Sequence, residues 1–205
     1  DIFNRFILAG YKLVQTWEGF VYHMTCRGSR FADGAKRNPN GEVFMKNRET
    51  DEWLAQNIRS TRNFIRKWGH FVKHDALMKP IVPPKYDIGL VIKNCDYQYL
   101  YELEPWCSTI YVDTFAEEYI EQEQPNTMFD LSERIYSIDE EKTNDIIIEF
   151  DVRDFTPEQH NLLANISEIL ANDEELEEGE FELGIFTIKV NKIKTYEEDL
   201  IKCER

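Results

Sequence analysis

The sequence has no apolar run that approaches the ~20 residues required by a helix spanning a bilayer. Its first residues also lack the basic and apolar regions of a secretory signal peptide. Both absences argue against a membrane-embedded or exported protein. We therefore expect a soluble, cytoplasmic protein without a transmembrane segment.

Cysteine is scarce, and the four cysteines form no C-x-x-C pair. This spacing excludes a small secreted scaffold held by disulfides, so it predicts reduced thiols at Cys26, Cys95, Cys107 and Cys203. Several catalytic patterns are missing as well. Spacing alone reveals no Ser/His/Asp triad, no glycine-rich phosphate loop and no paired carboxylates of a hydrolase.

The sequence does contain enough apolar material for a core. Hydrophobic residues make up 42% and aromatic residues 13% of its 205 residues, too many for a disordered chain even at a formal charge of -15. A chain of this length forms one large domain or two small ones.

The charge is divided unevenly along the chain. Residues 1–86 carry 15 basic and 8 acidic side chains, a net charge of +7, whereas residues 87–205 carry 9 basic and 31 acidic, a net charge of -22. The change falls at Lys79–Lys85, where three prolines interrupt any helix. We predict two domains with these bounds. The basic one suits phosphorylated ligands, and the acidic one argues against broad nucleic-acid binding, with a solvated surface as its simpler explanation.

Local patterns in the first part predict two helices, two strands and a loop. Helical spacing from Ile2 ends at Gly10, and a second helix begins at Thr50 or Asp51, ends at Gly69, and is expected to cover one side of the basic domain. Aromatic and β-branched residues predict short strands at residues 11–17 and 20–23, and the polar residues 27–42 predict a loop.

The second part has the pattern of an α+β domain. Thr156 and Gln159 form a capping box around Pro157, which opens the clearest helix. The apolar alternation after Phe181 changes phase, which predicts a bulge near Gly184. We further expect strands at residues 87–93, 108–112 and 146–152 and a helix at residues 97–103.

The first residues carry a pattern that points to a family. An acid at Asp1 is followed by Arg5 and by Ala9-Gly10-Tyr11. This run resembles the segment of family 2 type glycosyltransferases with the GT-A fold in which an E-D-x-D motif opens a helix. The resemblance implies that residues 1–86 are an α/β remnant of that fold. The catalytic base, a D-x-D metal motif and the nucleotide-binding strands are then expected upstream of Asp1, and these 205 residues alone are expected to transfer no sugar.

The resemblance also assigns site residues in the following segment. His23 matches a histidine that completes the coordination of a divalent cation on the donor diphosphate, and an imidazole ligand favours Mn²⁺ over Mg²⁺. Arg27, Ser29 and Arg30 then contact the phosphates. Trp17 is a candidate for stacking on a sugar. The simpler interpretations are a hydrogen-bonded histidine, a solvated basic loop and a core tryptophan. His70 and His74 have the i,i+4 spacing of a helical metal site, but Gly69 and Pro80 interrupt that helix.

Two classes of function follow. The resemblance implies part of an enzyme that moves a sugar from a nucleotide-sugar donor to a hydroxyl of a glycan or another acceptor, assisted by a metal ion. The alternative is a non-enzymatic interaction protein, with a basic module that binds an anionic partner and an acidic module that keeps it soluble or binds a partner.

Overall fold

The structure, a computed structural model, describes residues 1–14, 16, 18–19 and 51–201. The chain divides into two compact units, one formed by Asp1–Lys12 together with Thr61–Arg205 and the other by Leu13–Ser60. Among the described residues, no helix has the length and the hydropathy of a membrane span. Residues 79–85, where the sequence predicted a domain boundary, lie inside the first unit. The assignment of residues 1–86 to a glycosyltransferase-like domain stays a prediction.

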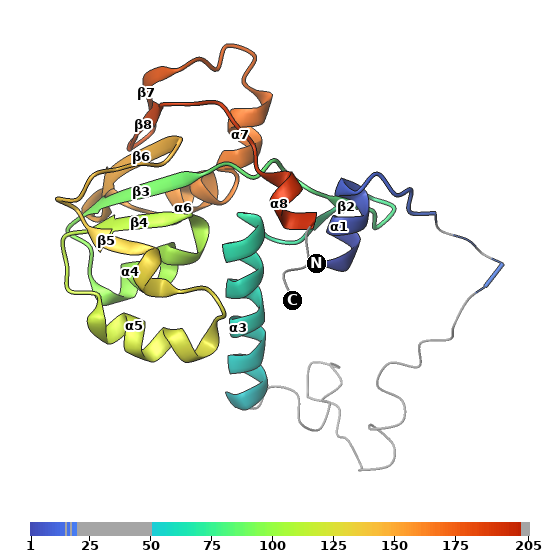
Figure 1. The fold of residues 1–205 in the computed structure, drawn as a ribbon, viewed down its shortest axis with the longest axis horizontal. Coiled ribbons are helices and arrows are strands. Elements are labelled where there is room, and N and C mark those ends of the chain that lie inside the picture. Colours follow the sequence, from blue (N-terminus) through green and yellow to red (C-terminus); the bar gives the residue numbers. More distant parts are fainter. Residues whose placement is uncertain (15, 17, 20–50, 202–205) are drawn as a thin grey trace, which may run out of the picture. The chain divides into compact units, whose positions relative to one another are not determined.

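The first unit is built on a mixed sheet of six strands in the order β5-β4-β3-β6-β8-β7, which Figure 1 shows from bottom to top. The strands are β3 (Ile88–Lys93), β4 (Thr109–Val112), β5 (Ile135–Ser137), β6 (Ile146–Asp151), β7 (Gly179–Leu183) and β8 (Phe186–Val190). The four strands β5, β4, β3 and β6 run parallel, and β8 pairs antiparallel with both β6 and β7. Parallel neighbours joined through helices define an α/β arrangement, in place of the α+β domain expected.

Of the helices, α1, α3, α4 and the start of α6 were predicted from the sequence, whereas α5 and α8 were not. The α-helices are α1 (Ile2–Leu8), α3 (Asp51–Trp68), α4 (Tyr97–Leu103), α5 (Glu117–Glu123), α6 (Pro157–Ala164), α7 (Ile166–Asn172) and α8 (Glu197–Ile201). The 3-10 turns are η1 (Glu104–Trp106), η2 (Gln124–Asn126), η3 (Leu131–Glu133) and η4 (Val152–Asp154). A separate two-stranded pair consists of β1 (Lys73–His74) and β2 (Pro80–Ile81).

One face of the sheet carries the main hydrophobic core. Ile88, Leu90 and Ile92 alternate along β3, and they pack with buried residues of α4, α6, α7 and the second half of α3. Because β3 lies in the centre of the sheet, its residues from Ile88 to Ile92 are all buried. Burial on both sides explains why this strand reads as a continuous apolar run in the sequence.

The other face holds a smaller cluster formed by Val91, Tyr111 and Ile147. The connection from β5 to β6 contributes Asn144, whose side-chain oxygen accepts a hydrogen bond from the Tyr111 hydroxyl at 3.0 Å. Gly89 faces Asn144, and a Cβ at this position would lie 2.8 Å from Asn144 Cγ. A glycine in the central strand therefore makes room for the connection that crosses the sheet.

The helices α1 and α3 begin and end as the sequence predicted. Gly10 and Gly69 have φ angles of +79° and +78°, the left-handed conformation that ends a helix. Residues 61–68 of α3 belong to the same unit as the sheet, and Ile65 is part of the main core. This half of α3 covers the sheet of the acidic part, and the expected role in a separate basic domain is not supported.

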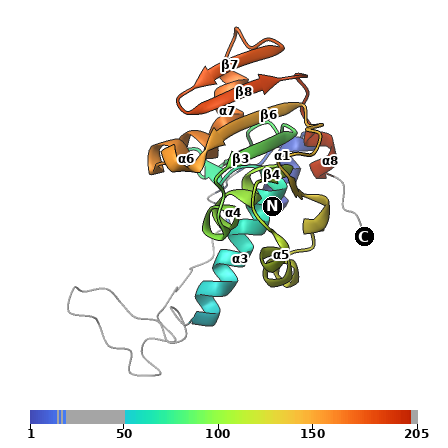
Figure 2. The same ribbon diagram turned by 90° about the vertical axis from the view of Figure 1, so that its left-hand side faces the viewer.

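Two details differ from the local predictions. The phase change after Phe181 comes from a hairpin turn and not from a bulge, because Leu183 pairs with Phe186 around the two residues Gly184 and Ile185. Figure 2 shows this β7–β8 hairpin at the top of the sheet. The predicted single helix after Pro157 is interrupted at Asn165, which separates α6 from α7. Residues 11–14 form no strand, and residues 15, 17 and 20–50, which include the strand predicted at 20–23 and the loop predicted at 27–42, lie outside the described residues.

Candidate functional site

The order in which the chain adds strands to the sheet reverses at β3. The chain passes from β3 to β4 and β5 on one side and then returns to β6 on the other side. In open α/β sheets, ligands bind outside the carboxyl ends of the strands near such a reversal. The edge formed by the ends of β3, β4 and β6 is therefore the first place to examine for a site.

The turn that follows β3 is held by a carboxylate from the next strand. Asp113, directly after β4, accepts hydrogen bonds from the backbone N–H of Asn94 at 2.6 Å and of Cys95 at 2.9 Å. Asn94 has a φ of 56°, a left-handed conformation that asparagine tolerates better than most residues. Its side chain also donates to Asp151 at the end of β6, at 2.8 Å. One turn thus connects the ends of three parallel strands.

This edge is negatively charged. Hydrogen bonds from Arg153 lower the pKa of the Asp151 carboxyl to about 2, so this group is ionised at neutral pH. Asp96, the residue before α4, accepts a hydrogen bond from the backbone N–H of Tyr99 at 2.9 Å and so already caps that helix. A phosphate group would meet these carboxylates at short range, which makes the edge unfavourable for a phosphorylated ligand.

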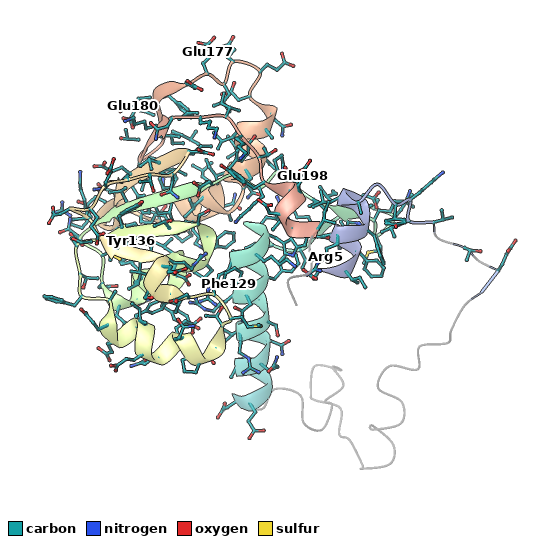
Figure 3. All side chains as sticks on the ribbon, in the orientation of Figure 1. Arg5, Phe129, Tyr136, Glu177, Glu180 and Glu198 are labelled. Carbon is teal, nitrogen blue, oxygen red and sulfur yellow. The ribbon has the colours of Figure 1, made fainter. Side chains whose placement is uncertain are left out.

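A pocket of about 420 Å³ lies at the same edge, beyond the ends of β4 and β5 and next to the start of α5. Its volume is within the range of small-molecule sites. The apolar part of its lining comes from Val112, Phe115, Ala116, Ile120, Ile135, Tyr136 and Ile138. Tyr136, labelled in Figure 3, stacks on Tyr111 with ring centroids 5.9 Å apart.

The polar part of the lining consists of hydrogen-bond acceptors and hydroxyl groups, namely Asp113, Thr114, Glu117, Ser137, Asp139 and Glu140. Three of them already accept hydrogen bonds. Asp113 accepts from the turn after β3, Ser137 Oγ accepts from Asp139 N, and Glu140 Oε1 accepts from Ser137 N. Within the described part of the chain, no hydrogen bond reaches the Asp139 carboxylate. Among the residues that the structure describes, no lysine, arginine or histidine lines this pocket.

Phe115 is a highly exposed part of this lining. The residue is 92% exposed although it comes only three positions after the buried end of β4. An exposed aromatic ring beside hydrogen-bond acceptors is a surface on which the apolar face of a ligand ring can pack. The pocket therefore combines an exposed aromatic ring, further apolar lining residues and the Asp139 carboxylate, which accepts no hydrogen bond from the described residues.

The site residues predicted from the sequence belong to a part of the chain that the structure does not describe. Trp17, His23, Arg27, Ser29 and Arg30 are all outside the described residues, so their expected roles stay predictions. Within residues 1–14, 16, 18–19 and 51–201, no group of three His, Cys, Asp or Glu side chains is placed to hold a metal ion.

Asp1 and the two histidines have structural contacts. The Asp1 carboxylate forms an ion pair with Lys67 at 2.5 Å and accepts from Trp68 Nε1 at 3.2 Å. His70 is buried, its Nδ1 lies 2.5 Å from the carbonyl oxygen of Phe71, and burial lowers its pKa. His74 lies in β1, so the two histidines do not share a helix.

Sequence reasoning missed the pocket at the sheet edge. The strand at residues 108–112 was predicted, and Asp113-Thr114-Phe115 follows it directly. An acid at the end of a strand is a usable signal only if the strand is known to be parallel to its neighbours, because only then do the carboxyl ends meet. No local pattern gives that information.

Comparison with known proteins adds no identification: no family model, no curated protein and no solved structure matches this chain. The class of protein therefore rests on the geometry. It is an α/β protein with a six-stranded mixed sheet and an acidic pocket at the carboxyl edge.

Proposed function

We propose that the unit containing the sheet binds a neutral, hydroxyl-rich ligand in the pocket at the ends of β4 and β5. The observation that carries this proposal is the lining of the pocket, in which carboxylates and hydroxyls lie beside an exposed phenyl ring and to which the described residues contribute no basic side chain. Sugars and the ribose of a nucleoside share the matching chemistry, since they have several hydroxyl donors and an apolar face.

The charge of the edge supports a neutral ligand over a phosphorylated one. Asp96, Asp113 and Asp151 surround the turn after β3, where dinucleotide-binding sheets instead have a glycine-rich turn for the pyrophosphate. Hydroxyl groups, in contrast, donate to carboxylates at short distance and form charge-assisted hydrogen bonds.

We propose further that the chain is part of a glycosyltransferase that moves a sugar from a nucleotide-sugar donor to a hydroxyl acceptor, and that the pocket holds the acceptor. The support is the resemblance of the first residues, whose helix α1 begins after Asp1 and ends before Gly10, as the family pattern implies. In this proposal the donor diphosphate is bound by Arg27, Ser29 and Arg30, with a divalent cation at His23. The cytoplasmic location belongs to the same proposal.

The alternative is an interaction protein without catalytic activity. The net charge of -22 on residues 87–205 favours it, because such a surface attracts basic partners. Sugar transfer by a longer parent chain that contains these residues would decide for the enzyme.

The binding proposal is tested by titrating the 205-residue chain with cellobiose, adenosine and UDP, using NMR shifts and calorimetry. Cellobiose or adenosine should bind, and UDP should not bind at this pocket. Phe115→Ala and Asp139→Asn should each weaken binding by roughly fivefold or more, which corresponds to about 1 kcal/mol. Met128→Ala is the matched control, because Met128 is 102% exposed and lies outside the pocket lining. Equal affinities of all four proteins, or equal binding of UDP at this pocket, would contradict the proposal.

The transferase proposal is tested separately in the longer parent chain. His23→Ala should raise the Mn²⁺ concentration required for transfer, because losing a metal ligand commonly costs about 10 to 100-fold in affinity or activity. The control is the melting temperature, which should not change. Superimposable Mn²⁺ titrations of parent and variant would show that His23 is not a ligand.

A further inference from the structure

A second pocket, of about 500 Å³, lies between α4 and the start of α6 and shares no lining residue with the pocket described above. Asp96, Gln98, Tyr99 and Glu102 line it from the α4 side, and Phe155, Thr156, Pro157 and His160 line it from the α6 side. The proposed function makes no use of this space.

Two aromatic rings form part of its lining. Tyr99 and Phe155 are perpendicular, with ring centroids 6.4 Å apart. Phe155 also stacks on Phe150, whose side chain is buried in the core, at a centroid distance of 5.2 Å. The rings are therefore held in place by the fold, and they offer a rigid apolar surface to a ligand.

Two carboxylates accompany the rings. Asp96 uses Oδ1 to cap α4, and Glu102 uses Oε1 to accept from Gln98 Nε2 at 3.2 Å. Among the described residues, no hydrogen bond is made to Asp96 Oδ2 or to Glu102 Oε2. The described residues that line the pocket include neither a lysine nor an arginine, so none of them neutralises the two acids.

The histidine of the pocket does not supply a positive charge. His160 is half-buried, and its ring lies edge-on to Trp106 at a centroid distance of 5.4 Å. Burial lowers the pKa of this imidazole, so it stays neutral at pH 7. The pocket thus combines a net negative charge with aromatic surface.

We propose that this pocket binds an organic cation, a guanidinium or an ammonium group on a hydrocarbon stem. Aromatic rings attract cations through their negative faces, and a carboxylate pairs with the charged group. The volume is far larger than a bare metal ion needs, and the described residues place no three metal-binding side chains together. The stem of the ligand packs on Tyr99 and Phe155 while the charged end reaches Asp96 and Glu102. Such a cation is available as an arginine or lysine side chain of a peptide or as a free polyamine.

The proposal is tested by NMR titration of the full chain with Nα-acetyl-arginine amide, Nα-acetyl-lysine amide and spermidine. The neutral probe is Nα-acetyl-citrulline amide, which has nearly the shape of the arginine probe without its charge. Shifts of the Tyr99, Phe155 and His160 resonances are expected with the cations and not with citrulline. Preference for the amides indicates a peptide side chain, and preference for spermidine indicates a polyamine.

The matched variants are Glu102→Gln and Glu121→Gln, since both side chains are exposed and only Glu102 lines the pocket. Glu102→Gln should weaken binding of the preferred cation about tenfold, as expected for one lost charge-assisted contact. Glu121→Gln should leave the affinity unchanged, and both variants should keep the parent melting temperature. Absence of binding by all three cations, equal binding of citrulline, or equal affinities of the two variants would overturn the proposal.

Discussion

Arg66 Nη2 lies 2.7 Å from Glu104 Oε2, and both side chains are completely buried. The same guanidinium donates to Glu123 at 2.5 Å, and Glu104 also pairs with Arg134 at 2.9 Å. Arg66 lies in α3, whereas Glu104 lies in η1 and Glu123 is the last residue of α5. This buried ionic network therefore fixes residues 61–68 of α3 to the unit that contains the sheet, where Arg62 joins it through Glu123.

The first prediction concerns the stability contributed by this network. Arg66→Met should lower the free energy of unfolding by about 3–5 kcal/mol, because the buried carboxylates of Glu104 and Glu123 each lose a charged partner. Arg59→Met is the control on the same helix, since Arg59 is exposed and its hydrogen bond within the described part of the chain is a local one to Gln56. That change should cost less than about 1 kcal/mol. Urea unfolding measures both, and equal losses would show that the network does not stabilise the fold.

The second prediction concerns pH. Burial alone would raise the pKa of the Glu104 carboxyl, but Arg134 and Arg66 together hold it below its ordinary value of 4.5. A pKa lowered by folding stabilises the folded state above the ordinary value, and this contribution is lost as the pH falls through the folded pKa. The difference in unfolding free energy between the parent and Glu104→Gln should therefore be constant at pH 5–7 and shrink below about pH 4.5. A constant difference down to pH 3 would contradict the lowered pKa.

The third prediction concerns Gly89 and the crossing connection. Gly89→Ala should destabilise the protein by about 1–3 kcal/mol, because the new methyl group overlaps the Asn144 side chain. Asn144→Ala should also be destabilising, since the Asn144 amide donates to Asp87 at 2.8 Å. The double variant should lose less than the sum of the two single losses, because removing the amide makes room for the methyl group. Strict additivity in urea unfolding would rule out the close approach.

The fourth prediction concerns the thiols. Burial raises the pKa of Cys95 and of Cys107 to about 12, so both thiols stay protonated and unreactive in the folded protein. In a variant with Cys26→Ser and Cys203→Ser, a thiol reagent at pH 8 should label neither remaining cysteine. Both should react at once in urea. Rapid labelling of the native variant would mean that one of the two sites opens to solvent.

Much of the secondary structure followed from the sequence because its signals are local. The helix after Asp51 ends at Gly69, and the capping box at Thr156 opens α6 where it was predicted. The errors have physical reasons as well. A hairpin turn and a bulge at Gly184 both reverse the apolar alternation, so the pattern alone does not distinguish them.

The net charge of the chain does change from basic to acidic at residues 79–85, but this change does not mark a boundary between compact units. The basic residues Arg62 and Arg66 are buried against Glu104 and Glu123 of the acidic part. Oppositely charged side chains from two halves of a chain can form buried ion pairs, and the sequence alone does not indicate which side chains are buried.

The sequence by itself determined where α1 and α3 begin and end and where α6 begins, because caps, glycines and prolines act within a few residues. Only the tertiary structure decided the candidate sites. Asp113 holds the turn at Asn94 across 19 positions, and Arg66 meets Glu104 across 38. The second pocket likewise needs α4 and α6 side by side. Such contacts depend on the order and the direction of strands in the sheet, which is set by packing of the whole chain and not by any local pattern.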